Sequence, residues 1–165
     1  MSAIIAFNKA KNKPVYADAN STLRVTYGTV GGYSPQDGLV ATPFISLEGL
    51  LAKNTDVDPF NAPKKLQEQI KAKLYGDYTG GMNTVPVNFL SNVDTTGGNS
   101  GSPTLNGKAE LVGLLFDGVY ESIIGDWDYN PELNRSIHVD SRYMLWVMDK
   151  VDNAQNLLDE MTIVK

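Results

Sequence analysis

The sequence contains no cysteine and only one histidine, His138, among its 165 residues. Without cysteine there is neither a disulfide framework nor a thiolate metal site to consider. A lone histidine cannot build a centre with several imidazole ligands, and no Glu-x-x-His or His-x-x-x-His spacing surrounds it. We therefore expect no metal site and no cofactor.

Membrane-spanning runs and an excess of basic charge are also missing. The apolar run at residues 3–7 has five members, far fewer than the roughly 20 of a transmembrane helix, and it lacks the layout of a signal peptide. The formal net charge is −5, whereas nucleic-acid binding needs a clustered basic surface. We expect neither a membrane span nor a nucleic-acid partner.

The length of 165 residues suits a single domain over residues 1–165, and the apolar fraction of 42% is enough for a hydrophobic core. Apolar and polar residues alternate at positions 21–28, which predicts a half-buried strand, and residues 31–38 are typical of a turn. Residues 85–94 and 108–116 predict further strands. The strand-rich regions are therefore 14–45 and 85–125.

Helices are predicted in four places. Residues 44–54 predict a short helix, and residues 63–75 predict a longer one whose apolar stripe is formed by Leu66, Ile70 and Leu74, with Gly76 as its cap. The last two helices are expected at about 140–150 and 154–161. The predicted fold class is thus mostly β with peripheral helices.

Residues 94–107 read DTTGGNSGSPTLNG, with Ser100 in the middle. Asn106 and Gly107 predict a β-hairpin with a type I′ turn. A Gly-x-Ser-x-Gly elbow of an α/β-hydrolase is excluded, because Ser102 stands where the second glycine belongs and because a strand, not a helix, follows.

The same stretch matches four of six positions of the trypsin-like motif Gly-Asp-Ser-Gly-Gly-Pro, with Ser100 at the nucleophile position. In that motif the backbone N–H groups of Gly98 and Ser100 form the oxyanion hole. Asn99 replaces the aspartate that pairs with a newly freed amine in zymogen activation, so we expect no such activation. The alternative is a plain Gly/Ser turn that leads into a hairpin.

A nucleophilic serine needs a base. His138 and Asp140 lie two residues apart and share one face of a predicted strand, so a triad with Ser100 is conceivable. The alternative is a structural histidine. Trypsin-like catalysis joins two barrels, and a chain of this size with several helices has room for about one, which favours a base located outside this chain.

Four segments resemble the dipeptidyl-peptidase 7 and 11 family of bacterial serine exopeptidases. They are DTTGGNSGSPTLNGKAELVGLLFDGVYESI at 94–123, DWDYNP at 126–131, RSIHVDSRYMLWVMDKV at 135–151 and PVYADANSTLRVTYGTVGGYSPQDG at 14–38. The resemblance implies one barrel of a chymotrypsin-like double β-barrel, with Ser100 as nucleophile and Gly98 in the oxyanion hole. It also implies that the His and Asp of the triad precede this chain, which alone should be inactive.

The resemblance further implies partners and a location. The partners would be peptides with a free N-terminus, the N-terminal remainder of the same polypeptide and a second copy in a homodimer. The location would be periplasmic or at the cell surface. A rival hypothesis is a protease-like binding or assembly module without chemistry.

Specificity is expected to depend on Phe116, Asp117 and Gly118. In the family, arginine at the position of Gly118 accompanies acidic P1 side chains and glycine accompanies bulky apolar ones, since arginine would pair with a carboxylate and fill the pocket. Asp117 matches a position that helps to bind the substrate's N-terminal amine. A competing prediction comes from Asp94, six residues before Ser100, where trypsin-like enzymes keep the carboxylate that selects basic P1 residues.

Overall fold

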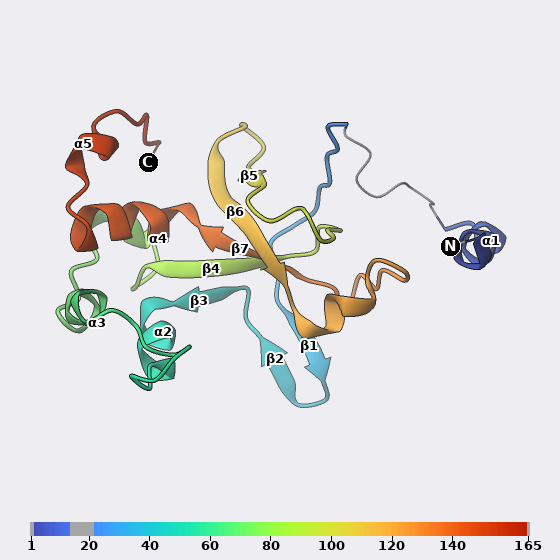
Figure 1. The fold of residues 1–165 in the computed structure, drawn as a ribbon, viewed down its shortest axis with the longest axis horizontal. Coiled ribbons are helices and arrows are strands. Elements are labelled where there is room, and N and C mark those ends of the chain that lie inside the picture. The colour runs from blue at the N-terminus through green and yellow to red at the C-terminus, as the bar shows by residue number, and fades with distance from the viewer. Residues whose placement is uncertain (1, 14–21, 165) are drawn as a thin grey trace.

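A computed structural model describes residues 2–13 and 22–164. Its main element is an antiparallel sheet of five strands, and a separate two-stranded hairpin lies beside it (Figure 1). In spatial order the sheet contains β3 (Phe44–Ser46), β4 (Pro86–Ser91), β7 (Ser136–Asp140), β6 (Leu111–Gly118) and β5 (Pro103–Leu105). The hairpin consists of β1 (Tyr33–Gln36) and β2 (Leu39–Ala41).

Most helices gather at one end of the sheet, whereas the first lies at the opposite end of the molecule (Figure 1). The helices are α1 (Ser2–Ala10), α2 (Leu47–Lys53), α3 (Lys64–Lys71), α4 (Ser141–Trp146) and α5 (Gln155–Leu158), with short helical turns η1 (Gly76–Thr79), η2 (Tyr120–Ile124) and η3 (Val147–Val151). Within the described ranges, no helix is both long and apolar enough to cross a membrane.

A hydrophobic core joins these helices to the sheet. Trp146 of α4 is fully buried at its centre, and its indole N–H donates to the Leu74 carbonyl at 2.9 Å. The other members of this core are Leu47, Leu66, Ile70, Val85 and Val151. Each large apolar side chain buried in this way contributes about 1.5–3 kcal/mol to folding. The helices therefore hold the start of β4 and the end of β7 in place.

The strand predicted at 21–28 is wrong over the described residues 22–28. Leu23 and Tyr27, which were expected to face a core, are 94% and 92% exposed, and no described strand pairs with this segment. Pairing begins only at Val30, which bridges to Ser91. An alternating pattern fits an extended backbone, but a strand also needs a partner that local sequence does not reveal. Residues 14–21 of the predicted strand-rich region lie outside the described residues.

The turn predicted at 31–38 is wrong in its first half, because Tyr33–Gln36 forms β1. Proline in a strand argues against a central position, yet β1 belongs to a two-stranded hairpin in which Pro35 can stand at a free edge. The turn itself is shorter than predicted and uses Gly38, whose φ is +76°.

The hairpin after Ser100 is confirmed, but its turn type differs from the prediction. The Asn106 N–H donates to the Glu110 carbonyl at 3.0 Å, and Ala109 adopts a left-handed φ of 62°. These features define a three-residue loop rather than a two-residue type I′ turn. The side-chain oxygen of Asn106 accepts the Lys108 and Glu110 N–H groups at 2.9 and 3.1 Å, and these bonds favour the longer loop.

Several helix ends also differ from the prediction. The helix expected at 63–75 ends at Lys71, since Lys73 takes a φ of 53°, and Gly76 opens η1 instead of capping α3. Leu74 is consequently 50% exposed and not part of the buried stripe. The helix expected at 140–150 is α4 continued by η3, the one expected at 154–161 shortens to α5, and α2 confirms the short helix within 44–54.

Candidate active site

The loop that carries Ser100 consists of two consecutive β-turns that share Asn99. The Asn99 N–H donates to the Thr96 carbonyl at 3.2 Å, which closes the first turn. The Ser102 N–H donates to the Asn99 carbonyl at 2.9 Å, which closes the second. Ser100 is therefore the second residue of its turn, at an exposed corner between β4 and β5.

Glycine is required at the third residue of both turns. Gly98 has a φ of +95° and Gly101 a φ of +85°, the positive values that a type II turn needs at this position. Any other L-residue would be strained there. Both glycines are thus required by their positive φ and not by a lack of space, since a Cβ at either position would meet no atom within 4 Å.

Not every backbone N–H group of this loop forms a hydrogen bond within the described residues. The Gly101 N–H donates to the Leu115 carbonyl at 2.7 Å, whereas the N–H groups of Gly98 and Ser100 meet no acceptor among the residues that the structure describes. The unused N–H groups of the serine and of the residue two before it are the donors expected of a trypsin-like oxyanion hole.

The Ser100 hydroxyl donates to the Phe116 carbonyl at 3.3 Å. Phe116 is the extra residue of a β-bulge in β6, since Leu115 pairs with His138 and Asp117 with Ile137. Bulges bend a strand and are frequent beside active sites. Here the bulge brings the main chain of β6 against the serine.

A cavity of about 250 Å³ opens beside Ser100. Its lining includes all three residues that the sequence predicted for substrate binding, Phe116, Asp117 and Gly118. None of the described residues that line it is lysine, arginine or histidine, and its carboxylates are those of Asp94, Asp117 and Asp126. The structure therefore brings the nucleophile candidate and the specificity candidates into one acidic cavity.

Two lining residues, Asp126 and Tyr129, were not singled out from the sequence. Burial raises the pKa of Asp94 above its usual value, and the neighbouring Asp126 carboxylate raises it further. The Tyr129 hydroxyl donates to the Asn92 carbonyl at 2.6 Å, and burial followed by the Asp94 charge raises its pKa. The only available signal was the DWDYNP segment, which the resemblance quoted without assigning roles.

The wall formed by Gly118 has room for a side chain. A Cβ at this position would lie 3.4 Å from the Ser122 Cβ and 3.7 Å from the Arg135 carbonyl oxygen, which is ordinary contact. Its neighbour Asp117 is exposed, and one carboxylate oxygen accepts the Gly118 N–H at 2.8 Å. Gly118 thus leaves space in the cavity through its size, not through a special backbone conformation.

His138 is held away from Ser100. It is 2% exposed and is hydrogen-bonded through Nε2 to the Ser91 hydroxyl and through Nδ1 to the Thr104 hydroxyl, each at 2.7 Å. Its ring stacks on Phe89 with the centroids 4.8 Å apart. Burial lowers the pKa of His138 to about 4, so it is neutral at physiological pH.

Asp140 shares the buried face of β7 with His138, as predicted, but serves another partner. Its carboxylate caps α4 and forms an ion pair with Arg142 at 2.7 Å. The conceivable triad of Ser100, His138 and Asp140 is therefore not formed. Since His138 is the only histidine of the chain, no imidazole of this chain bonds to Ser100.

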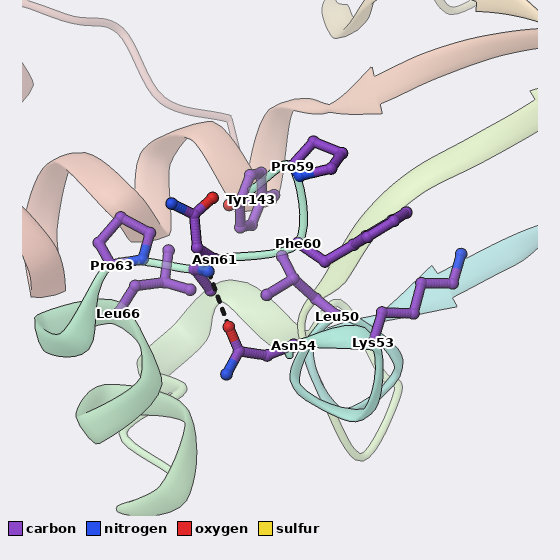
Figure 2. Close-up of a pocket in the computed structure, with 10 residues that line it drawn as sticks. Leu50, Lys53, Asn54, Pro59, Phe60, Asn61, Pro63, Leu66 and Tyr143 are labelled. Atoms are coloured by element: carbon purple, nitrogen blue, oxygen red, sulfur yellow. Dashed lines mark hydrogen bonds between the residues drawn. The ribbon is translucent and has the colours of Figure 1, made fainter. Parts of the chain in front are cut away.

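A second cavity, of about 300 Å³, lies between α2 and the loop at residues 54–63 (Figure 2). Its walls are mainly apolar and include Phe60, Leu66 and Tyr143. The Asn54 side-chain oxygen accepts the Ala62 N–H at 2.8 Å and holds the loop across it (Figure 2). The residues that line it include no serine, histidine or carboxylate, and over the described ranges no cluster of three His, Asp or Glu side chains could hold a metal ion.

The sequence model of the family described as peptidase S46 matches residues 1–163. The chain belongs to the peptidase S46 family. It is 49% identical to an Asp/Glu-specific dipeptidyl-peptidase of Shewanella putrefaciens, with 100% of this chain and 26% of the relative aligned. It is 44% identical to the dipeptidyl-peptidase 7 of Phocaeicola vulgatus, with 93% and 21% aligned.

Solved structures agree with this S46 assignment. The crystal structure of Porphyromonas endodontalis DPP11 in complex with the dipeptide Arg-Asp matches with a TM-score of 0.85 and 40% identity, over 94% of this chain and 23% of that one. The match confirms the predicted fold class, mostly β with peripheral helices and one part of a chymotrypsin-like double barrel. The chain spans about a quarter of the length of its S46 relatives.

Proposed function

We propose that this chain is the nucleophile-bearing part of a longer S46 serine peptidase that removes dipeptides from the N-terminus of peptides. The observation that carries the proposal is Ser100, exposed on a double turn beside a cavity, with its own N–H and that of Gly98 making no hydrogen bond to the described residues. The names of the relatives support this reaction class.

The proposed chemistry is acyl transfer. The Ser100 Oγ attacks the carbonyl carbon of the second residue of the substrate, and its proton passes to a base. The N–H groups of Gly98 and Ser100 stabilise the oxyanion, each contributing roughly 2.7–4 kcal/mol to the transition state. The tetrahedral intermediate expels the shortened peptide as an amine, which takes up the proton, and water then releases the dipeptide from the ester.

The base is assigned to the preceding part of the longer polypeptide. The sole imidazole of this chain is buried and bonded to Ser91 and Thr104. The long hydrogen bond from Ser100 to the Phe116 carbonyl leaves the hydroxyl unactivated, because a carbonyl oxygen cannot take its proton at neutral pH. This chain alone is therefore expected to be inactive.

We propose that Asp117 binds the N-terminal amine of the substrate and so limits cleavage to the bond after the second residue. Its carboxylate is exposed at the rim of the cavity beside Ser100. A free N-terminal ammonium would form a charge-assisted hydrogen bond there, and a peptide that lacks this amine would lose that bond.

For the P1 side chain we propose an apolar preference. Gly118 leaves the cavity open, and the described lining offers three carboxylates and no cation, so an acidic P1 side chain would meet repulsion. The relatives include an Asp/Glu-specific dipeptidyl-peptidase at 49% identity and a dipeptidyl-peptidase 7 at 44%. The proposal for this chain therefore relies on its own cavity. A basic P1 side chain paired with Asp94 is the competing assignment.

The test uses the longer polypeptide and fluorogenic dipeptidyl substrates with Leu, Glu or Lys at P1, with and without an N-terminal acetyl group. We expect kcat/KM to be highest for Leu with a free amine, and Ser100→Ala to abolish turnover. Highest activity on Glu or Lys would overturn the apolar preference. Undiminished activity in Ser100→Ala would overturn the nucleophile. Absence of turnover and of fluorophosphonate labelling would favour the binding or assembly module.

A homodimer and a periplasmic or cell-surface location are further proposals, supported only by the family resemblance. Sedimentation of the purified polypeptide would test the first and cell fractionation the second. A monomer, or a cytosolic fraction, would refute the respective proposal.

A further inference from the structure

We propose that the side chain of Asn99 is a positioning residue that holds the oxyanion hole in its working geometry without an activation step. The inference rests on the proposed function, because it concerns how Ser100 and its two N–H donors are kept in place. Asn99 is one of the two residues by which the loop departs from the trypsin-like motif, and it replaces an aspartate that forms an ion pair with a freed N-terminal amine.

The position of Asn99 in the loop is the first observation. It closes one turn with its N–H and opens the next with its carbonyl, so its backbone lies in both hydrogen bonds that shape the loop. Its side-chain oxygen also accepts the Thr96 N–H at 2.9 Å. The turn that contains Gly98 is thus closed by two bonds between the same two residues.

The second observation is that two glycines lie between Thr96 and Asn99. Gly97 and Gly98 form the middle of the first turn, and glycine populates positive and negative φ almost equally. The Asn99 N–H bond that closes this turn is long, at 3.2 Å. Without the side-chain bond, the peptide between the two glycines could rotate and carry the Gly98 N–H away from the position of the oxyanion. A second bond across the turn restricts that rotation.

We call the bond from the Thr96 N–H to the Asn99 side-chain oxygen the Asn99 brace. It requires an acceptor oxygen at residue 99 and does not depend on a charge there. The Asn99 side-chain nitrogen donates to no acceptor within the described ranges, so only its oxygen matters. Aspartate offers the same oxygen at the same distance from the backbone, whereas alanine offers none. The pair of variants Asn99→Ala and Asn99→Asp therefore separates the acceptor from the rest of the side chain.

The experiment measures steady-state kinetics and fluorophosphonate labelling rates in the longer polypeptide, both normalised to folded protein. For Asn99→Ala we expect a loss of roughly 10-fold to 100-fold in kcat and in labelling rate, with KM nearly unchanged, because an oxyanion donor acts mainly in the transition state. Asn99→Asp should retain most of both rates. If Asn99 had only a structural role, Asn99→Ala would lower the melting temperature and leave kcat of the folded enzyme unchanged.

Hydrogen exchange in the unsubstituted protein provides a test that needs no variant. We expect the Thr96 amide to be protected and the Gly98 and Ser100 amides to exchange rapidly. Equal rates at Thr96 and Gly98, native kcat in Asn99→Ala, or an Asn99→Asp variant as slow as Asn99→Ala would overturn the inference.

The experiment distinguishes failure of the proposed function from failure of the inference about Asn99. If the protein reacts with the fluorophosphonate but releases no dipeptides, the proposed function falls, and the labelling rates of the variants decide the role of Asn99. If Ser100 does not react at all, the inference is overturned together with the function.

Discussion

The buried His138 makes the stability of this protein depend on pH in a defined window. Its ring is 2% exposed between two hydroxyls, and burial lowers its pKa to about 4 from an ordinary 6.5. Between these two values the unfolded chain binds more protons than the folded one, so stability rises with pH. The contribution is complete above pH 6.5 and is lost as pH falls towards 4. A shift of this size corresponds to roughly 3 kcal/mol.

The assay combines urea unfolding with NMR. The free energy of unfolding is measured from pH 7.5 to pH 4 for the unsubstituted chain and for His138→Gln, a neutral side chain that can still bond to one of the two hydroxyls. Because carboxylates also titrate in this range, the difference in slope between the two proteins isolates His138. We expect the unsubstituted chain to lose roughly 3 kcal/mol more than the variant.

The single histidine makes the NMR signal unambiguous. Its Cε1 proton should keep the chemical shift of a neutral ring down to about pH 4. Titration near or above 6.5 would show that the ring is solvated or paired with a carboxylate. That result would refute the structural role and revive His138 as a base.

Two further predictions concern the cavity of the longer peptidase. Gly118→Arg should shift the ratio of kcat/KM for Glu over Leu at P1 upward by about 10-fold to 100-fold, the value of a new charged hydrogen bond. Gly118→Met should lower activity on Leu without raising it on Glu, and equal effects of the two variants would contradict the role of charge. Asp117→Asn keeps the oxygen that accepts the Gly118 N–H but removes the charge. It should lower kcat/KM on free-amine substrates by about 10-fold, with no loss on acetylated ones; a loss on both kinds would instead indicate a structural role.

Local sequence predicted the elements that depend on neighbouring residues. The two turns around Ser100 each span four residues, and their left-handed positions are occupied by Gly98 and Gly101, so residue type alone indicates them. The short helix within 44–54 is similarly local, but it begins at Leu47 after the Ser46 cap, because residues 44–46 form β3. Segment 22–28 shows the limit of this approach, because an alternating pattern cannot tell whether a partner strand is present.

The candidate site could not be predicted in full from local sequence, because it depends on contacts between residues far apart in the chain. His138 bonds to Ser91 and Thr104, which are 47 and 34 positions away, and no spacing rule anticipates such partners. Asp126 reaches the cavity because the segment after β6 folds back towards Ser100. The family resemblance had located the cavity residues Phe116–Gly118, whereas the brace formed by Asn99 emerged only from the geometry of the loop.

Mass-spectrometric mapping of fluorophosphonate labelling tests the central claim most directly. The folded 165-residue chain and the longer polypeptide are labelled side by side, each with its Ser100→Ala counterpart. The account predicts rapid labelling of Ser100 in the longer polypeptide, negligible labelling in the chain alone, and none in either variant. Rapid labelling of Ser100 in the isolated chain, or labelling of a different residue in the longer polypeptide, would contradict a nucleophile whose base lies outside this chain.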